Sequence, residues 1–229
     1  MPIKFQYNNG SELPSGALSV REATAKLRGL LGEDFPTRSL FERYRPEQDW
    51  FLRPDCAEDI HGIDHETRVM VWQELLARLL TRDGAVLDQE ALRWAAATHD
   101  TQRSSDGADY LHGQQAAAWV ERQFIHRIPK ASLETVLYLN TWHVPSDNQA
   151  PEMTPELAVF KDADALDRVH IYDFDARYLR CGHARVLLQY LAQELYDLSE
   201  AKRWGEHYPV FDCVMAAALE IGLIGTEPA

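Results

Sequence analysis

A series of histidines and aspartates runs through the middle of this chain, and its members could together bind a metal ion. In chain order they are His65, the adjacent pair His99-Asp100, His112, His143 and Asp164. A buried imidazole or carboxylate is costly unless a partner compensates for it. Several such groups that converge need a shared partner, and a divalent metal ion suits nitrogen and oxygen ligands of this kind.

The apolar residues around each member have helical spacing, which predicts that the member faces a core. His65 shares a helical face with Val69, Trp72 and Leu76. Each of the other members shares an apolar helical face, or stripe, in the same way. These faces combine His99 with Leu92 and Ala95, His112 with Ala116 and Trp119, His143 with Val136 and Leu139, and Asp164 with Leu157 and Phe160. A single histidine on such a face is more often a hydrogen-bonded core residue. The metal interpretation therefore depends on the whole set.

The elements that must position these residues are all predicted to be helices. We predict helices over residues 18–32, 37–44, 63–82, from Asp88 to about Thr98, 111–126, from Ser132 to Trp142, from Thr154 onward, 182–202 and 208–223. Residues 1–16 are expected to be irregular, and residues 34–58 a wrapped connection around the helix at 37–44. No run alternates polar and apolar residues as a strand does, so the predicted fold class is all-α.

The composition indicates a globular protein whose negative charge disfavours binding to nucleic acid and to anionic membranes. Hydrophobic residues make up 45% of the 229 residues, and the net charge is −13. A strongly acidic chain disfavours binding to nucleic acid or to an anionic membrane surface. The three cysteines are far apart and lack a paired spacing, so we expect reduced thiols in a cytoplasmic protein without a membrane span.

Three short strings resemble the HD-domain metal-dependent phosphohydrolase superfamily. They are His65-Glu66-Thr67-Arg68-Val69, Ala95-Ala96-Ala97-Thr98-His99-Asp100 and Lys161-Asp162-Ala163-Asp164-Ala165-Leu166-Asp167. The resemblance covers about residues 59–170. It implies a single HD-type domain over residues 1–229, with that core and with flanking helices in 18–58 and 171–229.

The resemblance also implies a ligand set. His65, His99, Asp100 and Asp164 match the ligands of a first ion, with Asp162 as the open alternative to Asp164 and Asp167 as a support. His112 and His143 resemble the histidines that hold a second ion in some members. Alternatively, they contact substrate or support a ligand beside a single ion. The expected cofactor is one or two ions of Mn, Fe, Co, Ni or Zn, with Mg less suited to so many histidines.

The implied activity is hydrolysis of a phosphoester or phosphoanhydride bond in a nucleotide or other small phosphorylated compound, through a metal-activated water. Asp100 and His99 are the central catalytic candidates. Arg68, Arg103 and Lys161 are candidates for phosphate contacts, although Arg68 could equally form a helix-surface ion pair. The segment 173–180 could line the substrate pocket or be a plain amphipathic turn.

Several alternatives stay open at this point. The chain could be a metal-holding sensor without turnover, or a di-iron oxygenase on the same scaffold. The role of His61, four residues before His65, is undecided between a ligand, a proton shuttle and a first-turn hydrogen bond. A homodimer is also an open option. The string Gly-Tyr-Pro, which marks the branch acting on cyclic dinucleotides, is absent.

Overall fold

A computed structural model describes residues 17–227, and this part of the chain is all-α, as predicted. The irregular segment predicted for residues 1–16 lies outside the described residues. The α-helices are α1 (Val20–Leu31), α2 (Arg38–Glu42), α3 (Ile63–Arg82), α4 (Gln89–Ala96), α5 (His112–Gln123), α6 (Lys130–Trp142), α7 (Pro155–Asp167), α8 (Gly182–Val186), α9 (Ala192–Glu200) and α10 (Val210–Ile221). Short 3₁₀ turns and one π-helical turn, Ala201–Gly205, connect them.

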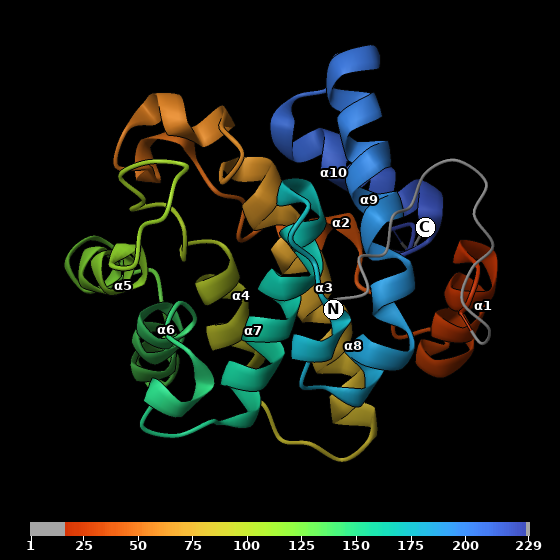
Figure 1. The fold of residues 1–229 in the computed structure, drawn as a ribbon, viewed down its shortest axis with the longest axis horizontal. Coiled ribbons are helices and arrows are strands. Elements are labelled where there is room, and N and C mark those ends of the chain that lie inside the picture. Colours follow the sequence, from red (N-terminus) through yellow and green to blue (C-terminus); the bar gives the residue numbers. More distant parts are fainter. Residues whose placement is uncertain (1–16, 228–229) are drawn as a thin grey trace.

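Helix α3 is the central element, and α4, α7 and α10 pack around it (Figure 1). Helices α5 and α6 pack on each other at one side of the molecule, and α1 lies at the opposite side. The predicted stripe of α3 is confirmed, since Val69, Trp72, Leu76 and Leu79 are buried. Its polar side is buried as well, including Glu66, Arg68 and Glu74. The helix therefore lies inside the protein, and its charged residues need partners there.

The helix ends follow the sequence signals for capping. The side chain of Thr154 accepts a hydrogen bond from the Leu157 amide at 3.1 Å, and Pro155 occupies the first helical position of α7. Asp88 caps α4 in the same way through the Ala91 amide at 2.9 Å. These caps fix where α4 and α7 begin, and both helices lead to predicted ligands.

The segment predicted to be helical over residues 182–202 is helical, but it is divided into shorter helices. The chain there forms α8, a 3₁₀ turn and α9, because Leu187 leaves helical geometry at φ −140° and ψ −66°. Leu187, Leu188 and Leu191 are all fully buried at this break.

The connection from α2 to α3 is tied to the loop that follows α4. The amide of Leu52 donates to the Thr101 carbonyl at 2.7 Å, and Gln102 Nε2 donates to the Trp50 carbonyl at 2.8 Å. Trp50 in turn packs on Phe124 and Trp94. The connection thus holds the loop that carries the predicted His99-Asp100 pair.

Within residues 17–227, no helix is both long and apolar enough to cross a membrane. The cysteines are free thiols, as predicted: Cys56 is partly exposed, and Cys181 and Cys213 are buried.

Candidate metal centre

Helix ends bring the predicted ligands together. His65 lies in the first turn of α3, and His99 and Asp100 lie in the turn that follows α4. His112 begins α5, and His143 follows the last residue of α6. Because α3, α4, α6 and α7 pack on one another and α5 packs on α6, these ends meet at one place.

The carboxylate of Asp100 lies at the centre of the cluster, and its two oxygens face different histidines. Its Oδ1 is 2.9 Å from His112 Nε2, 3.7 Å from His143 Nε2 and 4.0 Å from His99 Nε2. Its Oδ2 is 3.7 Å from His65 Nε2. Asp100 therefore lies between His65 on one side and His112 and His143 on the other, and His99 is also close to His65, with Nε2 atoms 3.2 Å apart.

Acceptor groups hold the outer nitrogens of the first histidine pair. His65 Nδ1 is 2.7 Å from the carboxylate of Asp167. His99 Nδ1 is 2.6 Å from Oε2 of Glu66 and 3.3 Å from the Ala96 carbonyl. Carboxylates and carbonyls accept, so Nδ1 of each ring carries the proton. In a neutral ring this leaves the lone pair on Nε2, the atom that faces the cluster.

The second histidine pair is oriented by backbone carbonyls in the same way. His112 Nδ1 bonds to the carbonyl of Asp109, with Arg103 Nη1 3.3 Å away, and His143 Nδ1 bonds to the carbonyl of Asn140 at 2.7 Å. The Asn140 side chain is buried and donates to Thr98 Oγ1 at 3.0 Å, which ties α6 to the turn that carries His99. All four rings thus present Nε2 to the cluster.

The facing nitrogens are too close for uncharged rings that both carry the proton on Nδ1. His65 Nε2 lies 3.2 Å from His99 Nε2, and His112 Nε2 lies 3.0 Å from His143 Nε2. Two lone pairs at this distance repel each other unless a proton or a cation lies between them. Burial is the main cause that lowers the pKa of His65 to about 4, although Asp167 and Asp100 act in the opposite direction. It would lower that of His99 too, but the charges of Glu66 and Asp100 raise it to about 10.

The donor set fits divalent metal ions. Ions with ligand bonds of about 2.1 Å place neighbouring ligand atoms about 3 to 3.5 Å apart, close to the spacings found here. Groups of nitrogen and oxygen atoms that lie within 4.8 Å of one another include His65 with His99 and Asp164, and His99 with Asp100 and His143.

The structure places Asp164 at the cluster and Asp162 away from it. Asp164 Oδ1 is 3.7 Å from His65 Nε2, and its side chain is 26% exposed. Asp162 is fully buried and accepts from the amides of Arg180 at 2.8 Å and Cys181 at 2.6 Å. Asp162 therefore anchors the chain after α7, and of the two aspartates only Asp164 lies at the cluster.

The three predicted phosphate contacts have different environments. Arg68 lies behind His65 and is 1% exposed, with Nε 2.7 Å from Asp167 Oδ1 and a second ion pair to Asp64. Its prediction as a phosphate contact is corrected, because the guanidinium is enclosed by these partners. Arg103 lies beside the centre, with Nη1 3.4 Å from Asp100 Oδ2.

Lys161 faces a cavity of about 900 Å³ that opens next to Asp164 and His143. The segment 173–180 lines this cavity, as the pocket alternative for it predicted. Each lysine and arginine that lines the cavity forms an ion pair with an aspartate. The pairs are Lys161–Asp147, Arg168–Asp173, Arg177–Asp175 and Arg180–Asp147. The aromatic lining is Tyr172, Phe174 and Tyr178.

Two residues near the centre were not predicted from the sequence. Glu66 is fully buried and contacts both residues of the His99-Asp100 dyad. Its Oε2 lies 2.6 Å from His99 Nδ1, and its Oε1 accepts a hydrogen bond from the Asp100 amide at 3.1 Å. Gly113 lets α5 approach α6, because a Cβ there would lie 2.3 Å from the Asn140 carbonyl and 3.0 Å from His143. In the sequence, Glu66 follows His65 and Gly113 follows His112, but the spacing of apolar residues does not show what either residue faces.

No protein-family model, curated protein or solved structure matches this chain. Functional interpretation therefore relies on the geometry of the centre and on the residues themselves.

Proposed function

We propose that the protein is a metal-dependent phosphohydrolase that acts on a small phosphorylated compound such as a nucleotide. The observation that carries the proposal is the orientation of four histidines, each with Nδ1 bound to an acceptor and Nε2 facing Asp100. Ordinary core histidines do not need such a common direction. This arrangement is typical of metal-binding imidazoles.

The residues would hold two ions on the two sides of Asp100. His65, His99, Asp100 and Asp164 would hold the first, and His112, His143 and Asp100 the second. Divalent ions supply a lowered pKa for water, toward about 7, and positive charge for phosphoryl oxygens. The imidazole-rich set favours Mn, Fe, Co, Ni or Zn over Mg.

The surrounding residues give these ligands their protonation state and direction. Asp167 and Glu66 keep a proton on Nδ1 of His65 and His99. Arg103 brings a guanidinium next to Asp100, where an incoming phosphoryl group would meet it. The cavity beside Asp164 provides room for the rest of the substrate, and its exposed aromatic rings suit stacking on a base.

Two measurements test the proposal. Elemental analysis after reconstitution should find divalent transition metal, and nucleotides and generic phosphate esters should be hydrolysed with Mn²⁺, Co²⁺ or Ni²⁺. His99→Ala and Asp100→Ala should abolish hydrolysis while far-UV circular dichroism stays helical. His126→Ala serves as the control, since this histidine is exposed. A reconstituted protein without metal, or full activity in either dyad variant, would refute the proposal. Oxygen consumption with redox-active iron would instead identify the oxygenase.

A further inference from the structure

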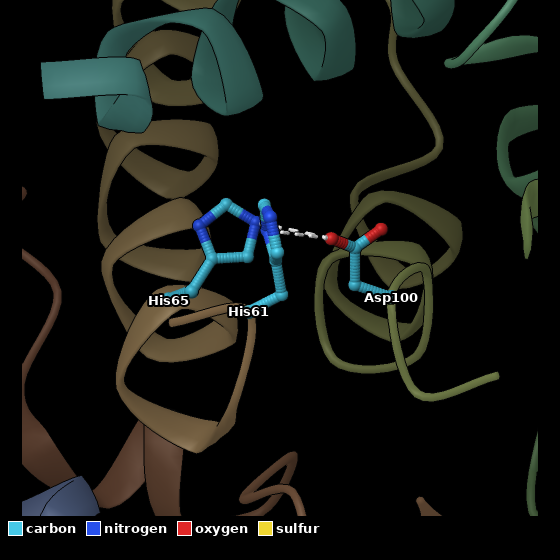
Figure 2. Close-up of side chains that lie close together, drawn as sticks. All are labelled: His61, His65 and Asp100. Atoms are coloured by element: carbon cyan, nitrogen blue, oxygen red, sulfur yellow. Dashed lines mark ion pairs between the residues drawn. The ribbon is translucent and has the colours of Figure 1, made fainter. Parts of the chain in front are cut away.

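His61 lies beside the candidate metal centre, and its Nδ1 atom has no hydrogen-bond partner there. Its side chain is 13% exposed, and its Nδ1 is 3.3 Å from Asp100 Oδ2. This buried nitrogen makes no hydrogen bond, because the ring is not aligned for one to the carboxylate. Figure 2 shows His61 beside His65, with both rings close to the Asp100 carboxylate. A buried nitrogen without a partner is costly, so this position calls for a ligand.

We propose that His61 is a further protein ligand of the ion held by His65 and Asp100. The inference rests on the metal site of the proposed function, and it adds a residue that the HD-type ligand set does not contain. Ligand atoms of His61, His65 and Asp100 lie within 4.8 Å of one another. The distances to Asp100 Oδ2, 3.3 Å from His61 and 3.7 Å from His65, suit neighbouring ligands of one ion.

The backbone before α3 is built to hold His61 in this place. Gly62 follows it directly and donates to the Asp59 carbonyl at 2.9 Å, which closes a tight turn. A Cβ at Gly62 would lie 2.4 Å from the Ala57 carbonyl oxygen and 2.8 Å from that of Asp59. Only glycine fits against these backbone atoms, so the turn cannot shift without moving His61 away from Asp100.

The rings next to His61 leave its nitrogen free for an ion. His65 and His170 contact it edge to face, with ring centroids 5.5 and 5.3 Å away. These contacts hold the plane of the ring but give Nδ1 no acceptor. His61 would make the side of Asp100 that faces His65 richer in imidazole, and imidazole ligands favour Fe, Co, Ni, Cu or Zn over Mg.

The decisive experiment titrates Mn²⁺ and Co²⁺ into the full-length apo protein by calorimetry. His61→Ala should weaken one class of site at least tenfold, since even residues that only support a ligand change metal affinity about 10- to 100-fold. The visible absorption of bound Co²⁺ should change with the loss of a nitrogen ligand. His126→Ala, an exposed histidine outside the centre, should bind both metals like the wild type.

A second variant separates the loss of a ligand from a loss of fold. In His61→Asp, a carboxylate oxygen lies two bonds from Cβ, as Nδ1 does in histidine, so a ligand returns at the same reach. This variant should recover most of the lost affinity, whereas a purely structural histidine would not be rescued by aspartate.

The outcomes distinguish this inference from the proposed function. If wild-type protein binds no divalent metal, the proposed function itself fails. If wild-type protein binds metal and His61→Ala binds it with the same affinity and the same Co²⁺ spectrum, only the role of His61 is overturned. Loss of affinity in His61→Ala that His61→Asp fails to restore, with both variants folded, would also overturn it.

Discussion

Glu66→Gln is the most informative single change in this protein, because it alters one buried atom beside the predicted ligands. The two carboxylate oxygens of Glu66 face different groups. Its Oε2 is 2.6 Å from His99 Nδ1, and its Oε1 accepts the Asp100 amide at 3.1 Å. An amide has one acceptor and one donor, so glutamine can satisfy only one of these contacts.

Either orientation of the glutamine has a cost that can be worked out. If its oxygen stays on the Asp100 amide, its NH₂ faces His99 Nδ1, and the His99 proton must move to Nε2, the ligand atom. Loss of the group that orients a metal ligand lowers metal affinity about 10- to 100-fold, which corresponds to about 1.4 to 2.7 kcal/mol. If the oxygen turns to His99 instead, the buried Asp100 amide loses its acceptor, at about 1–3 kcal/mol.

Calorimetric titration with Mn²⁺ measures this effect against a matched control. Glu74 lies on the same helix and is 1% exposed, but its partners are Arg78 and Arg93 and it does not touch the cluster. Glu74→Gln should therefore change stability without changing metal affinity. If Glu66→Gln and Glu74→Gln bind Mn²⁺ equally tightly, the argument from proton position is refuted.

Three further predictions concern the second ion and the thiols. His112→Ala should lower the metal content from two ions to one by elemental analysis, and an unchanged ratio would favour a single-ion centre. Gly113→Ala should weaken the same ion and cost about 1–3 kcal/mol in chemical denaturation, because its Cβ would meet the carbonyl of α6; wild-type values for both would contradict this. Burial raises the pKa of Cys181 and Cys213 to about 12 and shields both thiols from reagents, whereas Cys56 is partly exposed, so Cys56 should react fastest with a thiol reagent in the native protein. Fast labelling of all three would be the contrary result.

Local signals predicted much of the fold and brought the candidate ligands to helix ends. The stripe of His65 and the capping residues Asp88 and Thr154 depend only on neighbours in the chain, and the structure bears them out. The choice of Asp164 over Asp162 also followed from its place on an apolar stripe. Such signals work because a helix repeats every 3.6 residues wherever it forms.

Contacts between distant segments could not be predicted in this way. Arg68 is three residues from His65, which suggested a common site, but its direction depends on Asp167 from α7. The break at Leu187 depends on which faces of α3 and α10 need covering. Glu66 lies outside the stripe of His65, and its role requires knowing that the turn after α4 lies beside it.

The ion pairs around the cavity determine which groups can attract a phosphorylated substrate. Lys161 and Arg180 both pair with Asp147, and the whole chain carries a net charge of −13. A phosphate that approached the apo protein would have to displace these carboxylates and would also meet Asp100 and Asp164. Two divalent ions would bring four positive charges against the two negative charges of Asp100 and Asp164, which would leave the centre more attractive to a phosphate. On the proposed function, substrate affinity therefore depends on the ions being bound first, and the basic residues of the cavity contribute direction rather than net attraction.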